Sequence, residues 1–130
     1  MTGHRYWITP TARAQFHKIL RDTREKWGTD QAAQYGNALQ SGFRHIADNH
    51  RSLRSPHRAE LAGDSPLSVH LVEHHYVAFL EHSDGHVIIA GIFHEHMDIP
   101  NRLKGLQDLT RHELRTLKRQ IDKESRSDDA

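Results

Sequence analysis

Apolar residues recur at helical spacing in two neighbouring segments of the chain. The first stripe places them at i, i+4, i+7, i+8, i+11 and i+15, on Ala12, Phe16, Ile19, Leu20, Thr23 and Trp27. The second stripe has the same character, with Ala32, Tyr35, Leu39, Gly42, Phe43 and Ile46. Gly28 ends the first predicted helix, and Thr29 or Asp30 caps the second. So short a connection predicts an antiparallel helical hairpin.

Strand patterns lie on both sides of this hairpin. Residues 5–9 form a short aromatic and β-branched segment, and Thr9-Pro10 predicts the N-cap and first position of the following helix. Residues 49–66 are rich in Arg, Ser, His and Pro and predict a loop. Three further strands are predicted at residues 67–73, 76–81 and 87–93, with the turn Ser83-Asp84-Gly85 between the last two.

The C-terminal part of the chain predicts more helix. Residues 99–105 indicate a short helical turn, and an apolar stripe on Leu106, Leu109, Leu114, Leu117 and Ile121 predicts a C-terminal helix. We divide the chain into a domain at residues 1–105, a helical extension at 106–124 and a polar tail at 125–130, which we expect to be disordered. A chain cut after Leu106 should therefore still fold.

The predicted fold class is α+β. A strand is followed by an antiparallel helical hairpin and an antiparallel three-stranded meander, with the helices on one side of the sheet and a C-terminal helix added. Both faces of the sheet are apolar, and the hairpin can cover only one of them. A partner segment or the C-terminal helix must cover the other face.

Composition narrows the possible functions. The chain has 130 residues, enough for one domain, and its lack of cysteine rules out disulfides and thiolate chemistry. Eighteen Lys and Arg against seventeen Asp and Glu leave a formal charge of +1, which provides little general affinity for phosphates. No segment has the roughly 20 apolar residues that span a bilayer. We expect a cytoplasmic protein that binds neither membranes nor nucleic acid directly.

Four separated segments carry motifs in a characteristic order. They are Tyr6-Trp7-Ile8-Thr9-Pro10-Thr11-Ala12, Trp27-Gly28-Thr29-Asp30-Gln31-Ala32-Ala33-Gln34-Tyr35, His75-Tyr76-Val77-Ala78-Phe79 and Phe93-His94-Glu95-His96-Met97-Asp98. In this order and spacing they resemble the RelE/ParE family of small bacterial toxins. The Trp-Gly turn and the His-x-x-Met-Asp ending are more similar to the ParE branch. Two positions depart from the family pattern, because Glu81 and His96 stand where members commonly carry Arg.

The resemblance implies the toxin of a type II toxin–antitoxin module, which inhibits DNA gyrase and is neutralised by a cognate antitoxin. Such a toxin acts through contact surfaces and needs no cofactor. Its partners would be the antitoxin and DNA gyrase. The residues that the resemblance and the end of the last strand suggest for these contacts are Tyr76, Phe79, His75, His94, His96, Met97 and Asp98.

Two alternatives remain open from the sequence. The first is a RelE-like endoribonuclease that cuts messenger RNA on the ribosome, with His94 and His96 as acid–base groups and Arg54 and Arg58 near the phosphate. No Lys or Arg occurs between Arg58 and Arg102, which disfavours phosphodiester cleavage because its transition state needs cations. The second is a degenerate toxin that only binds antitoxin.

The thirteen histidines raise the question of a metal site. His94 and His96 share one face of an extended segment, and His74 could lie beside them, as could His70 or His75, which would suit zinc. Without Cys, or Asp or Glu at ligand spacing, we predict no metal. Glu95 points away from both histidines and is expected to be solvated. By their spacing Trp27, Phe16, Phe43 and Phe79 are predicted core residues.

Overall fold

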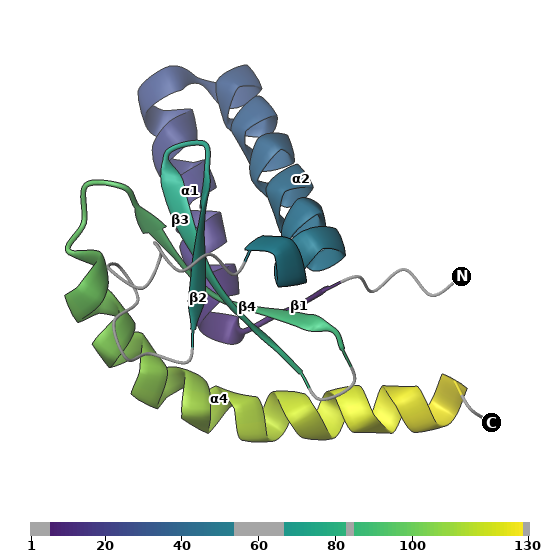
Figure 1. The fold of residues 1–130 in the computed structure, drawn as a ribbon. Coiled ribbons are helices and arrows are strands. Elements are labelled where there is room, and N and C mark those ends of the chain that lie inside the picture. The colour runs from purple at the N-terminus through teal and green to yellow at the C-terminus, as the bar shows by residue number, and fades with distance from the viewer. Residues whose placement is uncertain (1–5, 54–66, 83–84, 129–130) are drawn as a thin grey trace.

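A computed structural model describes residues 6–53, 67–82 and 85–128. Its elements follow the order β1 (Tyr6–Ile8), α1 (Pro10–Trp27), α2 (Thr29–Leu53), β2 (Ser68–Val72), β3 (His75–Glu81), β4 (Val87–His94) and α4 (Ile99–Asp128). The four strands form one mixed sheet in the order β1-β4-β3-β2, in which β1 runs parallel to β4 and the other pairs are antiparallel. In Figure 1 the α1–α2 hairpin lies on one side of the sheet and α4 runs along the other.

The predicted α+β class and the order of strand, hairpin and three-stranded meander are confirmed. The hairpin covers one face of the sheet, and α4 covers the second apolar face. The sequence analysis named either a partner segment or the C-terminal helix as the element that must cover this face, and the structure shows that it is the helix. Within the described ranges, no helix is both long and apolar enough to cross a membrane.

Two polar segments, after residue 48 and after residue 124, contain more helix than the sequence predicts. Helix α2 continues to Leu53, into the predicted loop, and α4 is unbroken from Ile99 to Asp128. The separate turn at 99–105 and a disordered tail up to residue 128 are therefore wrong. No Gly or Pro follows Gly105, and the intervening Lys, Arg, Glu and Gln residues are good helix formers, so nothing local stops the helix.

Helix α1 begins and ends where the sequence predicts. The backbone N–H of Ala12 donates to Thr9 Oγ1 at 3.1 Å, which makes Thr9 the N-cap, with Pro10 next to it. At the other end Gly28 adopts φ +98°, a conformation that favours glycine, and its N–H donates to the Arg24 carbonyl at 2.9 Å. These two caps determine the length of α1, the first helix of the hairpin.

Strand β4 contributes side chains to both layers of the core, and a bulge in it changes which residues face each layer. Ala78 pairs with Gly91 and Phe79 pairs with Ile89, so Ala90 is an extra residue on β4. The bulge lets Ile89 and Ile92 face the hairpin while Ala90 and Phe93 face α4. The hairpin-side cluster holds Ala12, Leu39, Phe43, Ile46, Val72, Val77, Phe79, Val87, Ile89 and Ile92. The cluster under the start of α4 holds Leu67, Val69, Ala78, Ala90, Phe93, Ile99, Leu103 and Leu106.

The start of α1 completes the outer edge of β4. Strand β1 pairs only with residues 87–89 of β4. Beyond it, the Thr9 N–H donates to the Ile89 carbonyl at 3.0 Å and the Thr9 hydroxyl donates to the Ala90 carbonyl at 3.2 Å. The Ile92 N–H donates to Gln15 Oε1 at 2.8 Å. Side chains thus take the place of a neighbouring strand along this edge.

Helix α4 packs its apolar side chains against the rest of the fold in two places. Its first turns cover β2, β3 and β4, and its later turns place Leu117 and Ile121 on Ile88 of β4. Between these, the N–H and hydroxyl of Thr11 in the first turn of α1 both donate to the Glu113 carboxylate, the N–H at 3.0 Å. The division of the chain at residue 105 stays a prediction.

Candidate functional site

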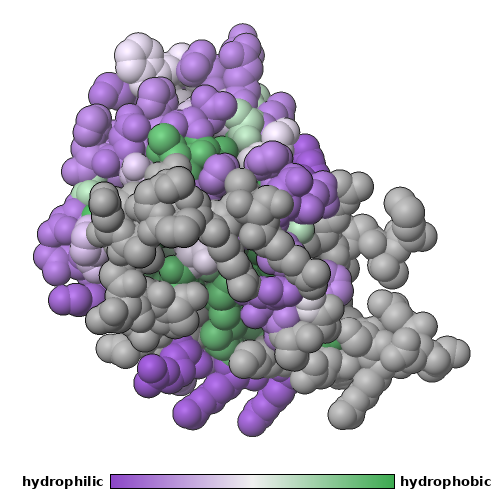
Figure 2. All heavy atoms as spheres, viewed as in Figure 1, coloured by the Kyte–Doolittle hydropathy of each residue, from purple (hydrophilic) through white to green (hydrophobic). Residues whose placement is uncertain are grey.

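A groove of about 850 Å³ opens between the second half of α1 and the ends of β3 and β4. The hairpin extends past the edge of the sheet here, so its inner side is left open. The lining residues come from α1, the start of α2, the β2–β3 turn, β3, β4, the β4–α4 link and the start of α4: Gln15, Lys18, Ile19, Asp22, Thr23, Lys26, Trp27, Gln31, Tyr35, His74, His75, Ile92, Phe93, His94, Met97 and Arg102. Figure 2 shows a largely hydrophilic surface over the hairpin.

Two large apolar side chains are exposed along this groove. Trp27 is 68 % exposed and Met97 is 44 % exposed. The predicted core position of Trp27 is therefore wrong, because the last turn of α1 lies beyond the sheet. The core positions of Phe43 and Phe79 are confirmed, and Phe16 packs against the same cluster from its edge. Exposed apolar groups of this size, gathered in one concave place, are typical of a contact surface.

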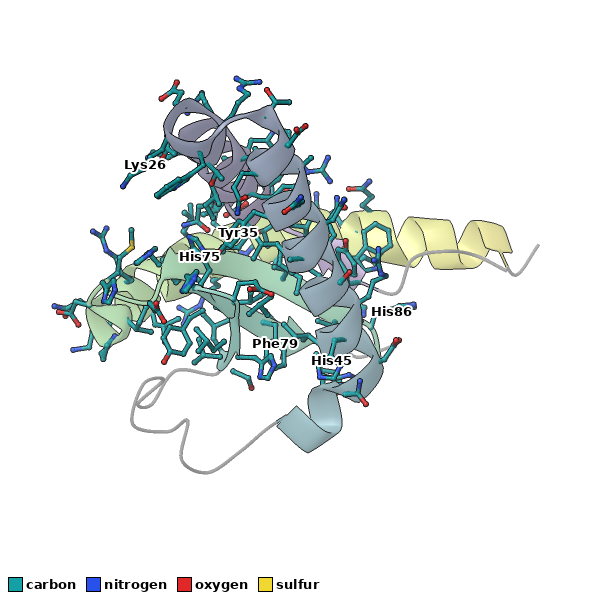
Figure 3. All side chains as sticks on the ribbon, turned by 90° about the horizontal axis from the view of Figure 1, so that it is seen from above. Lys26, Tyr35, His45, His75, Phe79 and His86 are labelled. Atoms are coloured by element: carbon teal, nitrogen blue, oxygen red, sulfur yellow. The ribbon has the colours of Figure 1, made fainter. Side chains whose placement is uncertain are left out.

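The floor of the groove is built around a pair of hydrogen-bonded side chains. Tyr35 of α2 points to His75 of β3, and its hydroxyl lies 2.5 Å from His75 Nδ1 (Figure 3). The His74 N–H donates to the same hydroxyl at 3.2 Å, so the Tyr35 oxygen contacts both His74 and His75. Burial, with the charges of His94 and His74, lowers the pKa of His75 to about 4. His75 is therefore uncharged at neutral pH, and its ring fixes the β2–β3 turn against α2.

The sequence-predicted histidines gather beside this pair. The His75 and His94 rings are 5.2 Å apart between centroids, and the His94 and His96 rings are 5.0 Å apart. The His96 N–H donates to His94 Nδ1 at 3.2 Å. Glu95 Oε1 lies 3.1 Å from His74 Nδ1 and 4.0 Å from His96 Nε2, so the expectation that Glu95 points away from His96 is wrong. The β2–β3 turn and the end of β4 are thus joined at the surface as well as through the sheet.

No group of three His, Asp or Glu side chains among the described residues is arranged to hold a metal ion. The sequence alternative of a site on His94, His96 and His74 therefore finds no such arrangement. The described contacts of these histidines are instead with one another, with Glu95 and with Tyr35 through the neighbouring His75.

Positive charge reaches the groove from the helices. Lys18 and Lys26 on α1 and Arg102 on α4 line it, although no cation lies in the strands themselves. Lys18 forms an ion pair with Asp22 at 2.9 Å, and Lys26 lies 5.8 Å from the centre of the Trp27 ring. The sequence argument from missing cations counted only the sheet region, so it does not hold for the assembled groove.

The other sequence candidates lie elsewhere. Arg54 and Arg58 fall outside the described residues. Phe79 is 1 % exposed in the hairpin-side core, and Tyr76 packs toward α4 on the opposite face from His75. Asp98 stands at the start of α4, where its carbonyl accepts from the Arg102 N–H and its carboxylate accepts from Asn101. Of the contact candidates, His75, His94 and Met97 line the groove.

Sequence reasoning missed Tyr35, Lys26 and Arg102 as groove residues. The sequence analysis placed Tyr35 on the buried apolar stripe of its helix. Its hydroxyl reaches the groove because His75, its hydrogen-bonding partner, lies on β3. One sequence signal could have identified Trp27 as a groove residue. Trp27 is the last residue of its stripe and is followed at once by Gly28, so its ring lies at the end of the hairpin rather than over the sheet.

A strand, a helical hairpin and an antiparallel three-stranded meander in one sheet make up the fold that the resemblance to RelE/ParE toxins implies. The family model for the ParE toxin of the type II toxin–antitoxin system parDE matches residues 6–99. The chain belongs to this family.

Curated relatives support the same assignment. Over 98 residues, 75% of this chain and 91% of the relative, the sequence is 32% identical to Toxin ParE of Escherichia coli. It is 28% identical over 105 residues to Toxin ParE1 of Mycobacterium tuberculosis, which covers 76% of this chain and 97% of that toxin. The chain is thus the toxin of a type II system, and its family implies an antitoxin partner.

Proposed function

We propose that this toxin acts in the cytoplasm on DNA gyrase and that its antitoxin holds it inactive by binding the groove. The observation that carries the proposal is the family match, which spans both helices of the hairpin and every strand. The resemblance of the Trp-Gly turn and the His-x-x-Met-Asp ending to the ParE branch supports gyrase as the target. Contact surfaces, rather than proton transfer, would then carry the activity.

The chemistry of the groove supports a segment of the antitoxin as its occupant. Trp27, Met97 and Ile19 offer apolar contact, and Lys26 and Arg102 stand at the same surface. A partner segment with apolar anchors and acidic flanking residues complements both features. Tryptophan is also among the residues that most often dominate the free energy of binding at an interface.

A substitution at Trp27 in the groove tests where the antitoxin binds. We expect Trp27→Ala to weaken antitoxin binding at least tenfold, since truncating a tryptophan that anchors an interface costs about 2 kcal/mol or more. Because Trp27 is 68 % exposed, the melting temperature of the free toxin should change little. Isothermal titration calorimetry against the product of the adjacent gene would measure the affinity.

Leu109→Ala is the matched control for that experiment. Leu109 is 45 % exposed but is not among the groove residues. Its truncation should leave the affinity for antitoxin unchanged. Equal losses for the two variants, or unchanged binding for Trp27→Ala, would place the antitoxin elsewhere.

The gyrase proposal is tested with purified proteins. Free toxin added to gyrase, ATP and supercoiled plasmid should cause linear DNA to accumulate, and prior addition of antitoxin should prevent it. A translating extract treated with the same toxin should keep its messages intact. If the toxin leaves gyrase activity unaltered but still binds the antitoxin, the protein is a degenerate toxin that only binds antitoxin.

The ribonuclease alternative retains one observation in its favour. Lys26 and Arg102 line the same groove as His94, so cations and an imidazole do meet there. Codon-specific message cleavage that is lost in His94→Ala, with gyrase unaffected, would establish this activity in place of gyrase inhibition.

A further inference from the structure

The two halves of α4 pack against separate parts of the molecule. Its first half, with Leu103 and Leu106, belongs to the cluster that covers Ala78 and Phe93. Its second half, with Leu117 and Ile121, belongs to a different cluster around Ile88, which includes the partly buried residues Trp7, Leu80 and Leu114. Between the halves Leu109 is 45 % exposed and both Arg111 and His112 are exposed. The helix therefore bridges two contacts with an open turn between them.

A polar contact joins the second half of α4 to α1. Glu113 accepts hydrogen bonds from the N–H and the hydroxyl of Thr11, at the first turn of α1. A carboxylate is favoured there because the free N–H groups and the helix dipole place partial positive charge at that end. Thr11 and Glu113 are 102 residues apart in the sequence, so this contact fastens the end of the chain to its beginning.

The family match adds an independent observation. It ends at residue 99, where α4 begins, so the helix lies beyond the part of the chain that the family model describes. The matched part already contains the whole sheet and the hairpin that forms the main core. The second half of α4 is thus an addition to the matched domain.

We propose that residues 113–121 of α4 form a strap that opens and closes as a unit while the rest of the domain stays folded. Closed, the strap buries Ile88 completely. Open, it exposes an apolar face made by Ile88, Trp7 and Leu80, none of which lines the groove. The Glu113–Thr11 contact sets the balance between the two states. Local openings of this kind are expected where a segment has few buried apolar contacts with the main core.

Because the chain contains no cysteine, a single introduced thiol can report the opening. We would place it by Ile88→Cys under the strap or by Val77→Cys under the hairpin, since both positions are 0 % exposed. In the full chain under native conditions, the thiol at position 88 should react with a thiol reagent at least tenfold faster than that at position 77. Adding Glu113→Gln should speed labelling at 88 about tenfold and leave labelling at 77 unchanged, since hydrogen bonds to a charged group are among the stronger ones.

Glu25→Gln is the matched control, because Glu25 is an exposed carboxylate on α1 far from the strap contact. It should change neither rate. Equal labelling at the two positions, or a Glu113→Gln effect of the same size at both, would show that α4 unfolds only with the whole domain and would overturn the proposal. The result does not depend on gyrase or on antitoxin, so it stands apart from the proposed function.

Discussion

Gly42→Ala should destabilise the toxin by about 1 to 3 kcal/mol, although alanine is the better helix former. A Cβ at Gly42 in α2 would lie 2.3 Å from Val72 Cγ1 and 2.8 Å from Val72 Cγ2 on β2. Val72 is a buried, β-branched residue with few alternative rotamers, so the helix itself would have to move away from the sheet. Chemical denaturation followed by circular dichroism would measure the free energy of unfolding.

Gly105→Ala is the same substitution at a position where the added Cβ meets no neighbouring atom. A Cβ at Gly105 in α4 meets no atom within 4 Å, and the position is exposed. The substitution should stabilise the protein by up to about 1 kcal/mol through helix propensity alone. Effects of the same sign at the two glycines would contradict the close approach of α2 to β2.

Acidification should lower the stability of the toxin between about pH 6.5 and pH 4, by an amount on the order of 2 kcal/mol from His75. In the unfolded chain His75 takes up a proton as the pH falls through 6.5. In the folded protein its pKa is about 4, chiefly because burial disfavours the charged ring, so it stays neutral over this window. The unfolded state therefore gains protons that the folded state does not, and the full stability is present only above about pH 6.5.

His75→Asn isolates this contribution, because asparagine can still accept a hydrogen bond from Tyr35 but does not titrate. The free energy of unfolding of this variant should fall less steeply between pH 6.5 and pH 4 than that of the wild type. His112→Asn, at an exposed position on α4, should reproduce the wild-type slope. A wild-type slope in His75→Asn as well would mean that another group dominates in acid.

The sequence predicts most of the fold because its signals there are local. Thr9-Pro10 and Gly28 determine where α1 begins and ends, and the short link between two apolar stripes leaves an antiparallel hairpin as the only arrangement. Helix α4 was less predictable, since its continuity depends on the absence of a stop signal. The parallel pairing of β1 with β4 joins residues about 80 apart and has no local signal at all.

The candidate site was predicted in part. The ending His94-Glu95-His96-Met97-Asp98 was identified as a contact region, and His94 and Met97 do line the groove. The position of Trp27 was wrong because periodicity shows which side of a helix a residue occupies but not how far the helix extends past the sheet. Lys26 and Arg102 reach the groove only through tertiary packing, so counting cations by sequence region could not find them.

The side-chain closure of β4 limits how a partner can be recognised. Peptides often bind by adding a strand to an open sheet edge, where main-chain hydrogen bonds supply affinity with little regard to sequence. On the outer edge of β4 the Ala90 carbonyl and the Ile92 N–H are already engaged by Thr9 and Gln15. A partner entering the groove there must rely on side-chain contacts, which distinguish one sequence from another. A cell that carries several related modules would gain from that arrangement, because each toxin could then be matched to its own antitoxin.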